Sequence, residues 1–129
     1  MVLPTTLCMA AAAAVLNLWL TIRIGQIRAA EKVFVGDGGN EPVIRRMRAQ
    51  ANFIENTPLT LLLVAAIELA GKGGAWLAPV AAVFVLGRVA HAFGMDGGFK
   101  PGRAIGAVTA MVVQLALAIA AVLVASGRL

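Results

Sequence analysis

Charged side chains are scarce in this 129-residue chain: they make up 13% of it, whereas hydrophobic residues make up 60%. A soluble domain of this length cannot hide so much apolar side chain, because small domains have too much surface for their core. No stretch alternates apolar and polar residues over about ten positions, as the strands of a membrane barrel do. The expected solvent is therefore lipid, and the expected elements are helices, whose backbone satisfies its own hydrogen bonds.

Four segments are long enough for a membrane span, which needs about 20 mostly apolar residues. Residues 2–22 and 104–127 contain no charge, whereas residues 53–71 contain two glutamates and residues 73–95 an arginine and a histidine. No Lys or Arg precedes Arg23, so the first segment lacks the basic start of a signal peptide and is expected to be retained. The expected fold is an all-α integral membrane protein, a single four-helix transmembrane domain over residues 1–129 with helices at about 3–30, 44–71, 75–95 and 101–126.

The basic residues are unevenly distributed along the chain. The connection between the second and third segments holds only Lys72 and the C-terminus only Arg128, while the other nine of the eleven lie at or near the remaining two connections. The positive-inside rule places those two connections in the cytoplasm and both termini on the other side. The net charge of +5 is thus explained by topology, and nucleic-acid binding is not expected, because no basic patch interleaved with aromatics accompanies it.

Ionisable side chains inside membrane helices cost roughly 3 kcal/mol or more, so each one needs a partner or a function. Glu68 is expected to pair with Lys72, which follows four residues later near the end of the second segment. Cys8, the only cysteine, is expected to be a packing residue. No metal site is expected.

The start of the second segment is harder to explain by packing alone. Arg45, Asn52 and Asn56 fall on one face of a helix, with Arg48 and Glu55 to one side of it. One polar face therefore runs about three helical turns into the membrane from the cytoplasmic end. The structural alternative is a basic collar with one internal Arg–Glu pair.

Further basic residues are expected at a similar depth. Arg88 and His91 lie one turn apart on the third segment, and Arg103 follows in the first turn of the fourth. Arg28, at the end of the first segment, joins them. We therefore expect these residues to meet Arg48 around a polar cavity near the cytoplasmic face.

Only two acidic residues, Glu55 and Asp96, are expected near these arginines. The excess of guanidinium groups favours a ligand bearing carboxylates, which arginine grips in a bidentate fashion. Glu55 would then be free to bind a ligand ammonium. The pattern predicts a zwitterionic, carboxylate-rich small molecule.

Three motifs in order resemble one known family. "RAQANFIENTP" (48–58) is similar to the R-A-x-x-N-x-x-E-x-x-P signature on helix 2 of the MAPEG family, the membrane-associated proteins in eicosanoid and glutathione metabolism. "LGRVAHA" (86–92) and "PGRAIG" (101–106) resemble its helix 3 and the start of its helix 4, and the likeness begins at "GQIR" (25–28). In motif the chain is most similar to the microsomal prostaglandin E synthase and microsomal glutathione transferase branch.

The resemblance implies a homotrimer of four-helix subunits in the membrane lipid, with glutathione bound between neighbouring subunits. It implies a transferase or peroxidase acting on hydrophobic electrophiles or lipid hydroperoxides, in which Arg103 favours the thiolate, the reactive nucleophile. The expected location is a bacterial inner membrane, with the site on the cytoplasmic side. The glutathione-binding residues carried over by motif are Arg28, Arg48, Asn52, Glu55, Arg88, His91 and Arg103.

Departures from the family keep a second function open. The chain has no tyrosine, and Met95 and Ala107 stand where family members use tyrosines to contact glutathione. Ala104 and Ala51 replace a serine and an arginine of the prostaglandin synthase, so the eicosanoid activities are not expected. The alternative is a non-catalytic lipid- or glutathione-binding protein on the same scaffold. A small multidrug transporter is disfavoured, because such a protein needs a membrane-embedded carboxylate and the first segment has none.

Overall fold

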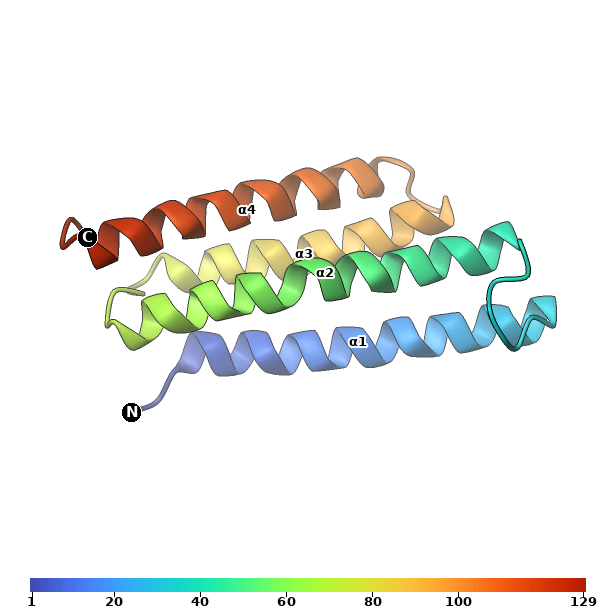
Figure 1. Ribbon diagram of the computed structural model, residues 1–129, viewed down its shortest axis with the longest axis horizontal. Coiled ribbons are helices and arrows are strands. Elements are labelled where there is room, and N and C mark those ends of the chain that lie inside the picture. The colour runs from blue at the N-terminus through green and yellow to red at the C-terminus, as the bar shows by residue number, and fades with distance from the viewer.

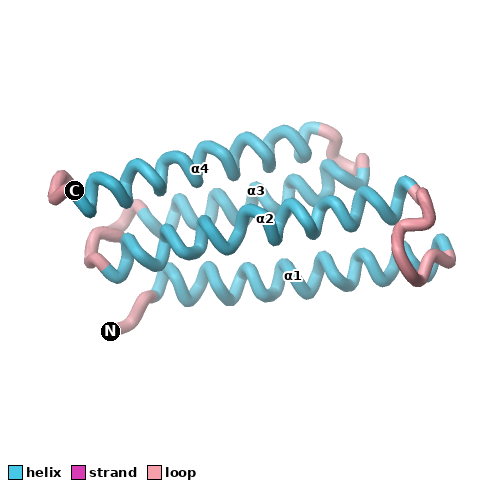
Figure 2. Tube along the Cα trace, viewed as in Figure 1, coloured by secondary structure: helices cyan, strands magenta, loops and turns pink.

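The computed structural model describes residues 1–129 and contains four long helices joined by short connections (Figure 1). All regular structure is helical, as Figure 2 shows. Each helix is long and apolar enough to cross a membrane, which confirms the all-α membrane fold predicted from the sequence. The helices are α1 (Pro4–Glu31), α2 (Glu41–Leu69), α3 (Leu77–Asp96) and α4 (Pro101–Ala125).

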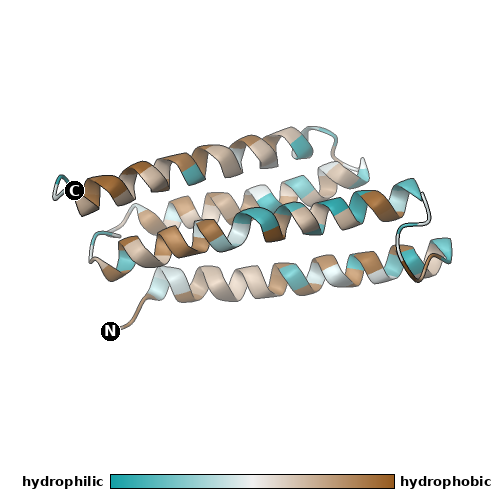
Figure 3. Cartoon of the chain, in the orientation of Figure 1, coloured by the Kyte–Doolittle hydropathy of each residue, from teal (hydrophilic) through white to brown (hydrophobic).

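Both termini lie at one end of the bundle, and the α1–α2 and α3–α4 connections lie at the other (Figure 1). Hydrophilic residues are concentrated toward the end with the two connections, whereas α4 is hydrophobic along most of its length (Figure 3). We call the end with the two connections the basic end, because most of the chain's arginines lie there. The polar residues considered below lie between this end and the middle of the bundle.

Helix α2 begins at Glu41, ahead of the expected residue 44, for a local reason. The side chain of Asn40 caps it by accepting a hydrogen bond from the Val43 backbone N–H at 3.1 Å. Pro42 fits the first turn, where a missing N–H costs nothing. These contacts extend the helix by nearly one turn toward the connection.

Glu68 does not pair with Lys72, so that prediction is wrong. Its carboxylate accepts hydrogen bonds from the backbone N–H of Thr5 at 2.8 Å and of Thr6 at 2.7 Å, and from the Thr6 hydroxyl at 2.7 Å. The first N–H groups of a helix have no partner within it and carry partial positive charge. Glu68 therefore caps α1 from the end of α2, which is a stronger use of the carboxylate than an exposed i,i+4 pair.

Helices α3 and α4 pack closely because glycines line their contact. A Cβ added at Gly102 would overlap the carbonyl group of Ala90, and one added at Gly106 would overlap the carbonyl oxygen of Gly87. Small residues four apart allow helix backbones to approach in this way. The contact sets how near the polar side chains of α3 come to the backbone of α4.

The apolar core is divided into two clusters along the bundle. The larger one lies toward the termini and includes Phe84, Leu77 and Leu117. The smaller one lies toward the basic end and joins Leu20 of α1 with Phe53 of α2. Polar side chains on α2, α3 and α4 reach into the interior near the smaller cluster.

Candidate functional site

Arg88 is the centre of the polar interior. The residue is only 4% exposed, and it donates one hydrogen bond to the side-chain oxygen of Asn52 and another to the backbone carbonyl of Gly106. One guanidinium therefore joins α2, α3 and α4. Of the predicted site residues, Arg88 and Asn52 are brought into direct contact, and His91 is buried one turn away, 5% exposed, against the backbone of Gly106.

A chain of amides continues from Asn52 toward the middle of the bundle. Asn56 donates to the carbonyl oxygen of Asn52 at 2.7 Å, and Gln114 of α4 donates to the side-chain oxygen of Asn56 at 2.9 Å. The sequence analysis did not single out Gln114. The available signal was a lone amide in the otherwise apolar fourth segment, because such a side chain in lipid needs a partner on another helix.

Arg48, Glu55 and Arg103 lie on the outside of the single chain. All three residues are exposed, and none takes part in any of the chain's three ion pairs. The side chains of Asn52 and Arg88 turn inward, whereas these three charges turn outward from α2 and α4. The outward faces of α2 and α4 thus offer two guanidinium groups and one carboxylate without partners inside the chain.

Arg28 is held by the connection that follows its own helix. It donates to the carbonyl oxygen of Val33 at 3.1 Å and of Gly36 at 2.5 Å, and its other terminal nitrogen lies 3.6 Å from the sulfur of Met47. These bonds fold the α1–α2 connection back onto α1. Within one chain Arg28 therefore makes no contact with the other predicted site residues.

Asp96 does not neutralise the predicted site arginines, which corrects the expectation above. It forms ion pairs with Arg23 of α1 and Arg46 of α2, the latter at 3.2 Å. The Arg23 guanidinium also lies over the rings of Trp19 at 4.8 Å and Phe93 at 5.2 Å, a cation–π arrangement. This network ties three helices together at the basic end. Asp96 therefore forms no ion pair with Arg103.

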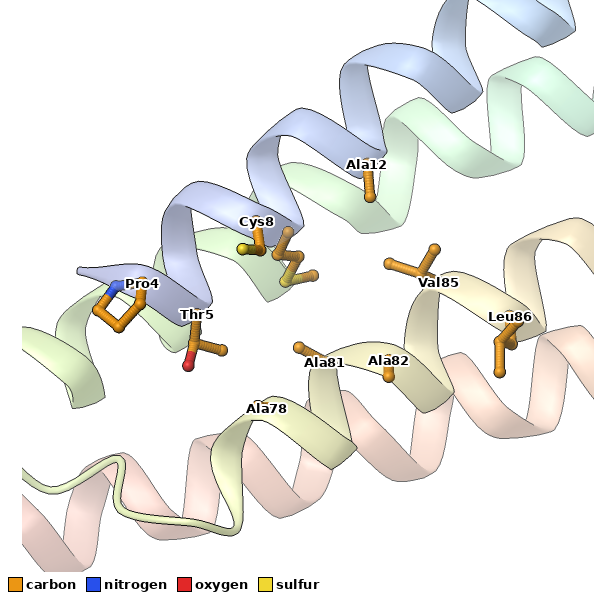
Figure 4. A pocket seen from close by; sticks show the side chains of 10 residues that line it. Pro4, Thr5, Cys8, Ala12, Ala78, Ala81, Ala82, Val85 and Leu86 are labelled. Carbon is orange, nitrogen blue, oxygen red and sulfur yellow. The ribbon is translucent and has the colours of Figure 1, made fainter.

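An apolar cavity lies away from these charges. The cavity has a volume of about 490 Å³ and lies between α1 and α3. Figure 4 shows Cys8 and Ala12 of α1 across from Ala81 and Val85 of α3. The cavity lies in the half of the bundle that holds the termini, among side chains with almost no hydrogen-bonding groups. Its chemistry suits hydrocarbon rather than a charged ligand.

A smaller cavity of about 320 Å³ lies at the basic end, beside Arg103. Arg45 and Lys100 line it with Arg103, although neither Arg45 nor Lys100 was among the predicted glutathione-binding residues. Their signal in the sequence was position: Arg45 lies on the polar face of the second segment, and Lys100 stands three residues before Arg103. No group of three or more His, Cys, Asp or Glu residues is placed to hold a metal ion.

One comparison with known proteins identifies a family. The model of the MAPEG family matches residues 6–123, nearly the whole chain and all four helices. No curated protein and no solved structure matches the chain.

Proposed function

Because the chain belongs to the MAPEG family, we propose that it is a glutathione-dependent membrane transferase or peroxidase. The observation that carries the proposal is the exposure of Arg48, Glu55 and Arg103 on the outward faces of α2 and α4, three charges without partners inside the chain. Its substrates are hydrophobic electrophiles or lipid hydroperoxides that enter from the bilayer. Helices that cross a membrane suit this class of substrate.

The residues present fit a zwitterionic tripeptide. Arg48 and Arg103 offer forked donors for carboxylates, and Glu55 offers an acceptor for an ammonium group. Asn52 is held in a fixed position by Arg88 at the edge of this surface, because Arg88 is buried and bonded to α4 as well. A side chain held in one rotamer loses less entropy when it binds a ligand.

Arg103 is the residue that we propose acts on the reacting atom. When bound, glutathione supplies a thiol, whose thiolate form is the nucleophile. A guanidinium beside that sulfur favours the thiolate, and a site shielded from water strengthens the effect. Arg28, which organises the α1–α2 connection, would reach the ligand only from a neighbouring subunit.

We propose a homotrimer for the same reason. A single chain leaves Arg48 and Glu55 exposed on a membrane-spanning helix, and charges facing lipid are costly. A neighbouring subunit that covers this surface would enclose the glutathione site and bring a second Arg28 to it. The cytoplasmic position of the site follows from the basic connections at that end of the bundle.

The test is turnover by purified protein in detergent. We expect glutathione-dependent conjugation of 1-chloro-2,4-dinitrobenzene or reduction of an organic hydroperoxide, with kcat in Arg103→Ala lowered by about a hundredfold, the scale of one lost transition-state contact. Arg128→Ala, a basic residue exposed at the opposite end, is the matched control and keeps full activity. Glutathione binding by calorimetry without turnover on any electrophile would contradict catalysis.

One observation favours the second candidate, a non-catalytic binding protein. Met95 lines the cavity beside Arg103, so a thioether stands where family members have a hydroxyl donor. Under this alternative a lipid raises the melting temperature of the detergent-solubilised protein, whereas millimolar glutathione does not. Turnover and this thermal shift together therefore separate the two functions.

A further inference from the structure

The cavity beside Arg103 has a composition that the proposed glutathione site does not explain. It lies between the start of α2, the end of α3 and the start of α4, and we call it the cation pocket. It has a volume of about 320 Å³, and three of its six lining residues are basic. The lining residues are Arg45, Gly94, Met95, Gly97, Lys100 and Arg103.

The charges of the cation pocket are almost uncompensated. Asp96 turns away to Arg23 and Arg46, and the first turn of α4 contains no acidic residue. Glu41 reaches the Arg45 side chain at 3.4 Å, but the two side chains are 74% and 52% exposed, so solvent weakens this pair. Three cations thus share one cavity with a single weak counter-charge, and an anion entering it is favoured.

Gly97 lines the pocket where α3 ends, and the Arg45 side chain lies near it. Gly97 ends α3 with φ of 83°, a conformation that residues with a side chain rarely adopt. A Cβ there would lie 3.8 Å from a terminal nitrogen of Arg45, so the guanidinium of Arg45 lies over the end of α3. The pocket is therefore built from backbone turns as well as from long side chains.

The surface next to the pocket is apolar. Ile105, Val108 and Met111 of α4 are exposed, between 48% and 70%, in the turns that follow Arg103. In a membrane-spanning helix these side chains face hydrocarbon or an apolar ligand. A molecule whose acidic group lies in the pocket can therefore leave its tail along α4 in the bilayer.

We propose that the cation pocket binds the acidic group of a membrane amphiphile, a carboxylate or a phosphate, and so selects acidic over neutral hydrophobic substrates. Basic pockets between membrane helices at the cytoplasmic side bind such groups through the same chemistry. Arg45 and Lys100 hold the acidic group, and Arg103 borders both this pocket and the proposed thiol site. The selection of substrates rests on the proposed function, whereas the binding of the acidic group does not.

The binding experiment compares an acid with its own ester. Oleate and methyl oleate are titrated by calorimetry into the protein in a non-ionic detergent, because the two differ only in the charged group. We expect oleate to bind more tightly, and Arg45→Gln and Lys100→Gln each to weaken oleate roughly fivefold, the scale of one cation near a membrane surface. The affinity of both variants for methyl oleate stays unchanged. Lys72 is an exposed basic residue at the other end of the bundle, and Lys72→Gln binds oleate as tightly as the wild type does.

Two further arms identify the source of the acidic group and separate the proposals. Displacement of oleate by phosphatidylglycerol, but not by phosphatidylcholine, supports a phosphate ligand, whereas resistance to both supports a carboxylate. If turnover occurs, Lys100→Gln raises KM for a fatty-acid hydroperoxide, leaves kcat unchanged and leaves KM for its methyl ester unchanged. Equal affinity for oleate and methyl oleate, or unchanged oleate binding in both variants, overturns the pocket. If the wild-type protein shows no turnover but binds oleate selectively, only the proposed enzymatic function is overturned.

Discussion

Arg88 shows how one buried side chain can fix the geometry of a polar site. Its two hydrogen bonds reach Asn52 on α2 and the carbonyl of Gly106 on α4, across a bundle that has lipid outside it. Because no water is present in the bilayer core, a polar group that loses its partner there is left without a hydrogen bond. Arg88 therefore stabilises the bundle and holds Asn52 at the same time.

Replacing Arg88 tests the first of these effects, its contribution to stability. We expect Arg88→Met to lower the free energy of unfolding by roughly 1–3 kcal/mol, because two buried acceptors lose their charged donor. Arg88→Lys retains part of this stability, since an ammonium keeps a donor but not the planar fork. Thermal unfolding of the detergent-solubilised protein, followed by circular dichroism, measures both, with Arg128→Met as the exposed control. A melting temperature in Arg88→Met equal to that of the wild type would contradict this role.

At the residue scale, the identity of polar partners was only partly predictable. Arg88 and Asn52 could be predicted to lie together, because residues that are costly in lipid must meet something polar. The partner of Glu68 could not, since local spacing favours Lys72 and the first turn of α1 lies more than sixty positions away in sequence. The choice depends on which helix ends meet, and that is a property of packing.

At the scale of elements, the tightest contact is the one between α3 and α4. Gly102 and Gly106 of α4 pack on the backbone of α3, so neither position has space for a methyl group. The same contact places the Gly106 carbonyl within hydrogen-bonding distance of Arg88. Packing and the polar interior are therefore coupled in this pair of helices.

A single added methyl group tests this coupling. We expect Gly106→Ala to destabilise the protein by about 1–3 kcal/mol, the usual cost of overpacking, and to weaken glutathione binding by displacing Arg88. Gly25→Ala is the matched control: it lies inside α1 with nothing within 4 Å of the added Cβ, so it is neutral or slightly stabilising. Thermal unfolding and calorimetry with glutathione report the two effects. Equal melting temperatures in the two variants would contradict this, because α3 and α4 would then accommodate the added methyl group without a cost in stability.

Helix spans could be predicted because lipid imposes both a length and an apolar composition. The relative rotation of the helices could not, since several faces of each helix are apolar. Small residues recur throughout this alanine-rich chain, so the pair Gly102 and Gly106 gave only a weak signal until the neighbouring backbone was in place. The same limit explains why Asp96 was expected near Arg103 rather than Arg23.

At the scale of the whole molecule, one chain leaves two very different surfaces exposed. The outer side of α4 is apolar, whereas α2 carries Arg48 and Glu55 outward within a membrane-spanning helix. The first surface suits lipid. The second is costly in lipid, on the order of 3 kcal/mol for each charge by insertion scales, and a neighbouring subunit with its ligand removes that cost.

The proposed homotrimer therefore depends on α2 and not on the apolar side of α4. We expect native mass spectrometry in a mild detergent to give three times the 13.3 kDa subunit mass at micromolar concentration. Arg48→Glu replaces a guanidinium by a second carboxylate on the face of α2 that carries Glu55, two turns away. It shifts the protein toward monomers, because the subunit contact then has to cover two negative charges and no positive one. Leu115→Ala, on the exposed apolar side of α4, leaves the trimer intact. A monomeric wild type would contradict the homotrimer. Dissociation by Leu115→Ala with an intact Arg48→Glu trimer would place the subunit contact on α4 and leave Arg48 and Glu55 to the lipid headgroups.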